Sequence, residues 1–116
     1  MRDFRKYEIW QVGMKVVNSV YSSMGNMPDH EKYGIRSQIS RSAVSIPSNI
    51  AEGCSRESEK GFKRFLEYSL GSCYELETQL IICETNKFID SIRIEVILTN
   101  LHQLQKQLCV LIIKLK

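Results

Sequence analysis

Residues suited to metal binding or catalysis are scarce in this sequence. The 116 residues include two histidines and four cysteines, with no Cys-x-x-Cys pair. His30 and His102 lie far apart and lack the spacing of metal ligands, so we expect no metal site. Neither histidine has a nucleophile or carboxylate in fixed register with it, and no glycine-rich loop follows a strand-like segment. We therefore expect no catalytic residues, no cofactor and no enzymatic activity.

Long hydrophobic runs are missing as well. No apolar segment approaches the roughly 20 residues that span a bilayer, and the N-terminal residues lack the apolar core of a signal peptide. We expect a cytoplasmic protein that does not bind a membrane. The four cysteines are Cys54, Cys73, Cys83 and Cys109. Three of them fall on apolar helix stripes, which favours a role as small core residues.

The composition is that of an ordinary folded domain. Hydrophobic residues make up 43% of the chain and charged residues 25%. A chain of this length can bury a core without disulfides or metals. We predict one domain over residues 1–116.

Four segments repeat apolar residues at alternating steps of three and four, the spacing of helices packed in a bundle. The predicted core positions are Tyr7, Trp10, Met14, Val17, Tyr21 and Met24 in residues 4–24; Ile35, Ile39, Ala43, Ile46 and Ile50 in residues 29–52; Phe62, Leu66, Ser69, Cys73, Leu76, Leu80 and Cys83 in a third segment; and Ile94, Ile97, Leu101, Leu104, Leu108, Leu111 and Leu115 in a fourth. Because the connections are short, this pattern predicts an all-α, antiparallel, up-down-up-down four-helix bundle.

Local signals predict where these helices begin and end. Acidic and proline residues suit the first turn of the second helix, serine or aspartate caps the third and fourth, and glycine or asparagine ends the first three. The second helix is predicted to start with Pro28, Asp29 and Glu31, the third to be capped by Ser55 or Ser58, and the fourth by Asp90 or Ser91. The first three helices are predicted to end at Gly25-Asn26, Gly53 and Asn86, respectively.

A proline stands inside the second helix. Pro47 lacks the backbone N–H of the helical ladder, which costs roughly 3 kcal/mol unless something compensates. The apolar stripe nevertheless continues through it, so we predict one kinked helix rather than two. The serines around the proline can bond the carbonyls that it frees and leave room for a close neighbour.

The same stretch carries a family resemblance. Gln38-Ile-Ser-Arg-Ser-Ala-Val-Ser-Ile-Pro-Ser-Asn-Ile-Ala-Glu-Gly53 resembles the signature of four-helix-bundle proteins encoded by intervening sequences in bacterial 23S ribosomal RNA genes. Phe62-Lys-Arg-Phe-Leu, Leu70-Gly-Ser, Glu75-Leu-Glu-Thr-Gln-Leu, Trp10-Gln and Pro28 with Glu31-Lys-Tyr-Gly are similar to the same pattern. One departure is Gly61, where an acidic partner for Ser58 is expected.

The resemblance implies further properties. It implies a four-helix bundle that assembles into a homo-oligomer, a ring-like pentamer, without enzymatic activity. A related branch is similar to the accessory proteins of diversity-generating retroelements, which assist a reverse transcriptase and bind nucleic acid.

Positive charge is concentrated at one end of the predicted bundle. The net charge of +3 is too small to indicate nucleic-acid binding by itself. Antiparallel packing gathers the start of the first helix, the connection between the second and third, and the end of the fourth into what we call the basic pole. Its cations are Arg2, Arg5, Lys6, Arg56, Lys60, Lys63, Arg64, Lys114 and Lys116, its acids are Asp3, Glu8, Glu52, Glu57 and Glu59, and nine minus five gives +4.

The opposite pole has the reverse balance. Lys32, Arg36, Lys87 and Arg93 stand there against Asp29, Glu31, Glu84, Asp90 and Glu95, and four minus five gives −1. We therefore predict nucleic-acid contacts at the basic pole, from Arg5, Lys6, Arg56, Lys60, Lys63 and Arg64. A solvated helix end of mixed charge is the alternative.

A second group of polar residues suggests a structural network. Arg41 lies beside core positions, where Glu75 or Glu77 could neutralise it in a buried or interfacial ion pair, and direct ligand contact is the less favoured role. Asn49 can bond backbone groups near the proline, and Glu52 belongs to the same set.

Two segments are apolar nearly all round their helices, residues 80–83 and 110–113. A bundle has one core, so a second apolar face needs a cover. Self-association is the simplest cover, and a different partner protein or a larger core are the alternatives. Two hypotheses for function result: an oligomeric bundle that binds RNA or DNA, or a protein-interaction scaffold, such as an accessory to a nucleic-acid enzyme.

Overall fold

Polar side chains at the predicted caps start the two longest helices. The Ser58 hydroxyl accepts a hydrogen bond from the Gly61 amide at 3.0 Å, and the Asp90 carboxylate accepts one from the Arg93 amide at 2.9 Å. Each bond satisfies a backbone N–H that has no partner within its helix. Of the two residues considered at each site, Ser58 and Asp90 are the caps.

The computed structural model describes residues 1–25, 27–31 and 33–115. Its α-helices are α1 at Glu8–Ser23, α2 at Ile35–Cys54, α3 at Glu59–Thr85 and α4 at Ser91–Lys114, with short 3-10 turns η1 at Phe4–Lys6 and η2 at Asp29–Glu31. These described ranges contain no strand. The prediction of an all-α fold with four helices packed as a bundle is confirmed.

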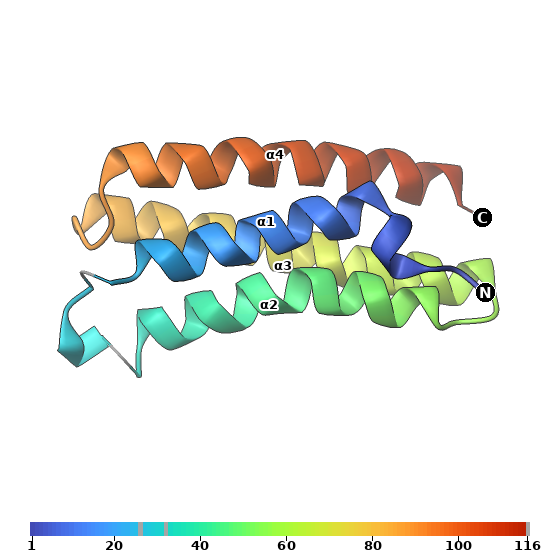
Figure 1. Cartoon of the computed structure of the whole chain (residues 1–116), viewed down its shortest axis with the longest axis horizontal. Coiled ribbons are helices and arrows are strands. Elements are labelled where there is room, and N and C mark those ends of the chain that lie inside the picture. The colour runs from blue at the N-terminus through green and yellow to red at the C-terminus, as the bar shows by residue number, and fades with distance from the viewer. Residues whose placement is uncertain (26, 32, 116) are drawn as a thin grey trace.

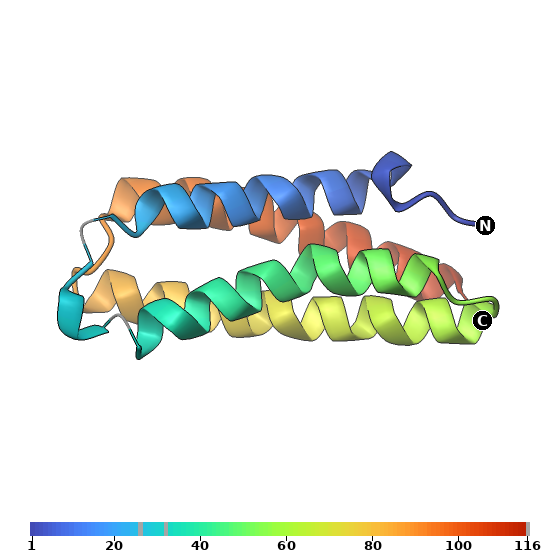
Figure 2. The same ribbon diagram turned by 60° about the horizontal axis from the view of Figure 1, so that its bottom comes forward.

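The helices lie side by side along one long axis. Figure 1 shows successive helices running back and forth along it, and Figure 2 shows the same layout after a 60° turn. The chain measures 44 × 24 × 20 Å along its principal axes. The N-terminus, the α2–α3 connection and the end of α4 consequently lie at the same end of the molecule.

The predicted stripes of the last three helices form the core. Every predicted position of α3 is buried, as are Ile39, Ala43, Ile46 and Ile50 of α2. In α4 the first five positions are buried, whereas Leu111 and Leu115 are half-buried because they lie near the helix end. Ile35, at the first residue of α2, is also half-buried.

The predicted stripe of the first helix is only partly right, because Val17 and Met24 are buried but its other members are not. Ile9, Val12, Val16 and Val20 form the buried face of α1, while Trp10 and Met14 are half-buried and Tyr21 is 52% exposed. Both stripes have helical spacing. The aliphatic stripe takes the core because it holds no polar atom, whereas the rings of Trp and Tyr carry an N–H or O–H that needs a partner.

The second helix begins later than predicted. Asp29 and Glu31 belong to η2 rather than to the first turn of α2, which starts at Ile35. Glu31 still serves the helix start from outside, because its carboxylate accepts from the Ile35 amide at 3.5 Å. Asn26, the other half of the predicted stop after the first helix, lies outside the described residues.

Of two other predicted helix-ending residues, Gly53 was wrong, whereas Asn86 is the C-cap of α3 but does not take the predicted left-handed conformation. Gly53 lies inside α2, whose C-cap is Ser55, and its conformation is not left-handed. A Cβ atom at Gly53 would lie 2.8 Å from the Phe65 Cβ, so this glycine is required by the close approach of α3. At the end of α3, Asn86 has φ −92° and Lys87 takes the left-handed conformation, with φ 60°.

Pro47 is inside one continuous helix, α2, as the uninterrupted apolar stripe predicted. The predicted kink stays a prediction. Gly13 of α1 faces the proline, because a Cβ there would lie 3.5 Å from both Ile46 Cγ2 and Pro47 Cβ. Because Gly13 has no side chain, α1 can pack close to the Pro47 ring.

Among the described residues, α4 is the one helix long and apolar enough to cross a membrane. Here Ile94, Ile97, Leu101, Leu104 and Leu108 are buried in the bundle.

Candidate nucleic-acid interface

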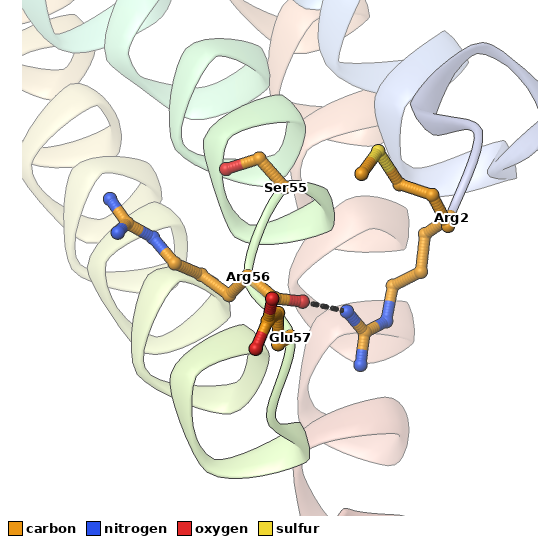
Figure 3. A pocket seen from close by; sticks show the side chains of 5 residues that line it. Arg2, Ser55, Arg56 and Glu57 are labelled. Atoms are coloured by element: carbon orange, nitrogen blue, oxygen red, sulfur yellow. Dashed lines mark hydrogen bonds between the residues drawn. The ribbon is translucent and has the colours of Figure 1, made fainter.

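The N-terminal segment is fixed across the α2–α3 connection at the basic pole. The Arg2 guanidinium donates to the Arg56 carbonyl at 2.5 Å, and its central carbon lies 4.3 Å from the Phe62 ring centroid. Figure 3 shows the Arg2 and Arg56 guanidinium groups on opposite sides of the connection. An open pocket of about 500 Å³ lies here, lined by Met1, Arg2, Ser55, Arg56 and Glu57.

Two of the predicted contact residues already have partners in the chain. Arg56 pairs with Glu52 at 3.3 Å and stacks 4.6 Å from the Phe65 ring centroid. Arg5 pairs with Asp3 at 3.7 Å and lies 4.4 Å from the Phe4 ring centroid. These exposed pairs are weak, so a phosphate can displace the carboxylates, but the side chains are already oriented.

Three cations on the first turns of α3 are without such partners. Lys60 and Arg64 are exposed and Lys63 is half-buried. Within the described chain none of the three makes an ion pair. Positions i, i+3 and i+4 share one side of a helix. They therefore form a compact positive surface, which we call the α3 basic cluster.

Other predicted members of the basic pole add charge around this cluster. Lys6 and Lys114 are exposed, and neither makes an ion pair in the described part of the chain. Lys116 at this pole and Lys32 at the opposite one lie outside the described residues. Gly61 is explained by its surroundings, because a Cβ there would lie 3.1 Å from both the Arg56 Cβ and the Ser58 Oγ.

The predicted polar network of Arg41, Asn49, Glu52 and Glu75 does not form within the chain. Arg41 and Glu75 are both exposed, and in the described residues Arg41 pairs with neither Glu75 nor Glu77. The intramolecular ion pair was therefore wrong, because Arg41 lies beside Tyr21 on the α1 side of α2. Glu52 pairs with Arg56 instead.

Asn49 does bond the backbone near the proline, as predicted. Its amide donates to the Ser45 carbonyl and to the Ser45 hydroxyl, both at 2.8 Å. The Ser45 hydroxyl in turn shares a hydrogen bond of 2.8 Å with Ser72 of α3. Asn49 thus has a structural role that needs no ligand.

Sequence reasoning missed a set of buried polar contacts between α2 and α3. Ser42 donates to the Gln79 side-chain oxygen at 2.6 Å, and Ser69 donates to the Ile46 carbonyl at 2.9 Å. Ser69 was predicted as a core position. The pairing of Ser42 with Gln79 could not be predicted, because glutamine is typical of a surface position. These bonds fix the register of α3 along α2.

Another polar cluster joins α3 to α4 at the surface. Glu77 accepts from the Gln105 amide at 2.8 Å, and its other oxygen lies 3.0 Å from His102 Nε2. The Gln105 hydrogen bond, followed by that of His102, lowers the pKa of the Glu77 carboxyl. Glu77 lies 13 residues along α3 from Arg64, about 20 Å at a rise of about 1.5 Å per residue, so it cannot belong to the same ligand site.

The cysteines occupy packing positions. Cys54, Cys73 and Cys83 are buried and Cys109 is half-buried, all with free thiols. Burial raises the pKa of Cys73 to about 12 and that of Cys83 to about 11. Thiols with such pKa values are poor nucleophiles at neutral pH. Across the described residues, no three His, Cys, Asp or Glu side chains are grouped to hold a metal ion.

An apolar groove lies between α1 and α2. It is lined by Trp10, Met14, Val17, Val44, Pro47, Ser48 and Ala51, over about 310 Å³. A second hollow of about 370 Å³ continues it past Tyr21, Ser40, Arg41, Val44 and Ser45. We call the two together the α1–α2 groove. Its signal in the sequence was the stripe of Trp10, Met14 and Val17, which the helical spacing assigned to the core of the first helix.

Comparison with known proteins gives a family and a fold. The family model described as 23S rRNA-intervening sequence protein matches residues 5–109. A solved structure from Bacteroides thetaiotaomicron, described as a protein of unknown function from the S23 ribosomal protein family, is 22% identical with a TM-score of 0.80, over 90% of this chain and 97% of that one. No curated protein matches the chain. None of these matches relates the chain to retroelement proteins.

Proposed function

The chain belongs to the 23S rRNA-intervening sequence protein family, and on that premise we propose that it is a non-enzymatic, oligomeric bundle that binds RNA or DNA at its basic pole. The observation that supports this most is the α3 basic cluster. Lys60, Lys63 and Arg64 are adjacent and free of ion pairs in the described chain, so binding a phosphate breaks no existing contact.

Electrostatics supports phosphate as the ligand. Each cation that neutralises a phosphate releases condensed counterions, which favours binding at low salt. The cluster also lies at the N-terminal end of α3, where the helix dipole is positive. Repeated around a ring of copies, the cluster would form a collar of positive charge.

The test reverses this charge and compares it with an equal reversal elsewhere. We expect Lys60→Glu, Lys63→Glu and Arg64→Glu in combination to abolish retention of RNA and DNA in a salt-titrated gel shift. The matched control is Lys15→Glu, Lys87→Glu and Lys106→Glu, which changes the net charge equally at exposed sites outside the pole. Equal loss in both variants, or unchanged binding in the first, would contradict the proposal.

A second candidate function is a protein-interaction scaffold, such as an accessory to a nucleic-acid enzyme like a reverse transcriptase. It is favoured by apolar side chains left exposed on α3 and α4, where Ile81 is 47%, Val110 53% and Ile113 82% exposed. A partner recovered from nuclease-treated extract, together with nucleic-acid binding that is insensitive to salt, would select this function over the first.

Self-association is part of the proposal. The family resemblance suggests a homo-oligomer, with a pentameric ring as the expected form, and the exposed apolar groups supply surface for it. Light scattering tests the assembly directly: a monomer at micromolar concentration would refute it.

A further inference from the structure

The outward side of α3 carries a regular exposed stripe. Its residues advance by three and four and are all exposed: Tyr68, Gly71, Glu75, Thr78 and Ile82. We call this set the α3 stripe. The Tyr68 side chain is 52% exposed and that of Ile82 is 42% exposed, so the stripe offers apolar surface around a central glycine.

Gly71 has no explanation inside its own chain. Nothing lies within 4 Å of a Cβ built there, in contrast to Gly53, where such an atom would meet Phe65. A glycine in an exposed helix interior costs about 1 kcal/mol relative to alanine. A close approach by another molecule would account for it.

The α1–α2 groove offers a hollow for this stripe and carries a cation where the stripe carries an acid. It is a hollow of apolar side chains, with Val44 and Pro47 at its centre and Arg41 towards one end. Arg41 and Glu75 are both exposed, and within the described residues neither has an ion-pair partner. One surface therefore has an unpaired cation and the other an unpaired carboxylate.

The two surfaces also lie at the same height along the bundle. Ser45 bonds Ser72, and Ser69 bonds the Ile46 carbonyl, so Gly71 is level with the centre of the groove. Ser42 bonds Gln79, which places Arg41 about one helical turn from Glu75 in height. An arginine side chain can span that offset. A rotation about an axis parallel to the bundle keeps copies level, so it can bring these surfaces together.

We propose that a second copy of this chain places its α3 stripe in the α1–α2 groove, with Gly71 against Val44 and Pro47 and with Glu75 paired to Arg41. The contact is heterologous, since two different surfaces meet, and repetition closes a ring or extends a fibre. This inference rests on the proposed self-association and specifies its interface.

Charge reversal tests this pairing. Arg41→Glu and Glu75→Arg should each lower the light-scattering mass and raise the midpoint concentration of assembly at least about 10-fold, since like charges meet in the contact. The double variant should regain most of the wild-type mass. Gly71→Leu should dissociate the assembly without unfolding the chain, because space is open around it. Lys106→Glu, exposed on α4, is the control and should leave the mass unchanged.

Circular dichroism of each variant confirms that the helices remain. A wild-type oligomer whose mass none of the three single variants lowers would overturn this interface and leave self-association standing. A wild-type monomer would overturn both.

Discussion

The hydroxyl of Ser42 on α2 donates to the buried side-chain oxygen of Gln79 on α3. Gln79 is 6% exposed, so water cannot replace a lost partner there. A buried acceptor without a donor costs about 1–3 kcal/mol. We expect Ser42→Ala to lower the free energy of unfolding by about 1–2 kcal/mol in urea titrations. Ser48→Ala, at an exposed position of the same helix, should change it by less than about 0.5 kcal/mol; equal effects would contradict the role of the buried bond.

Cys73 makes stability depend on pH in the alkaline range. Its thiol ionises near 9.0 when unfolded, and burial raises the folded pKa to about 12. Because the folded pKa is the higher one, the thiol's contribution is complete below pH 9 and is lost as pH rises towards 12. We expect the wild type to lose about 1–2 kcal/mol more stability than Cys73→Ala between pH 8 and 10.5.

Other groups titrate in the same range, so the comparison needs a second cysteine. Cys109→Ala, which removes a half-buried thiol from α4, is the matched control for the loss of a thiol elsewhere in the bundle. Parallel pH profiles for the wild type and Cys73→Ala would show that Cys73 does not supply the dependence.

Side-chain spacing was sufficient to predict most of the core, but not the choice between two apolar faces of one helix. All seven predicted positions of α3 are buried, because six of them are apolar and the seventh, Ser69, bonds the Ile46 carbonyl. In α1 the stripes of Val16 and of Met14 have equal spacing, and only the packed structure shows which one α2 and α4 cover. The pairing of Ser42 with Gln79 depends on helix register, which no single segment encodes.

At the scale of elements, glycines set how closely α2 meets its neighbours. Gly53→Ala would place a Cβ 2.8 Å from the Phe65 Cβ, an atom that no rotamer change can move. The helices must separate, which costs about 1–3 kcal/mol. Gly13→Ala meets Ile46 and Pro47 at 3.5 Å, an ordinary contact.

These two substitutions therefore have opposite expected signs in thermal unfolding. Gly13→Ala should be neutral or raise stability by up to about 1 kcal/mol through helix propensity, whereas Gly53→Ala should lower the melting temperature. A stabilised Gly53→Ala variant would show that α3 is not held against this end of α2.

The basic pole could be predicted from the order of the helices, but the cations that are free to bind a phosphate could not. Antiparallel connectivity alone places Arg5, Arg56 and Lys60 at one end. Which of these cations are free depends on contacts: Arg56 pairs with Glu52 at 3.3 Å and Arg5 with Asp3 at 3.7 Å. These acids lie within four residues of their partners, but in the described chain Glu59 and Glu67 lie equally near Lys63 and Arg64 in the sequence and do not pair with them, so local spacing could not separate the free cations from the paired ones.

At the scale of the whole molecule, assembly and nucleic-acid binding should be coupled. A ring presents several α3 basic clusters to one ligand, and linked sites bind with an effective concentration that a single site lacks.

Glu75→Arg provides a discriminating test, because it adds positive charge while it opposes Arg41 of the neighbouring copy. Charge alone predicts tighter binding of this variant, whereas loss of assembly predicts affinity at least about 10-fold weaker for a long RNA. We expect the weaker binding in gel shifts at fixed salt, with wild-type affinity restored by adding Arg41→Glu. An oligonucleotide too short to bridge two copies should bind the wild type and Glu75→Arg with similar affinity, and a large loss there would contradict the coupling.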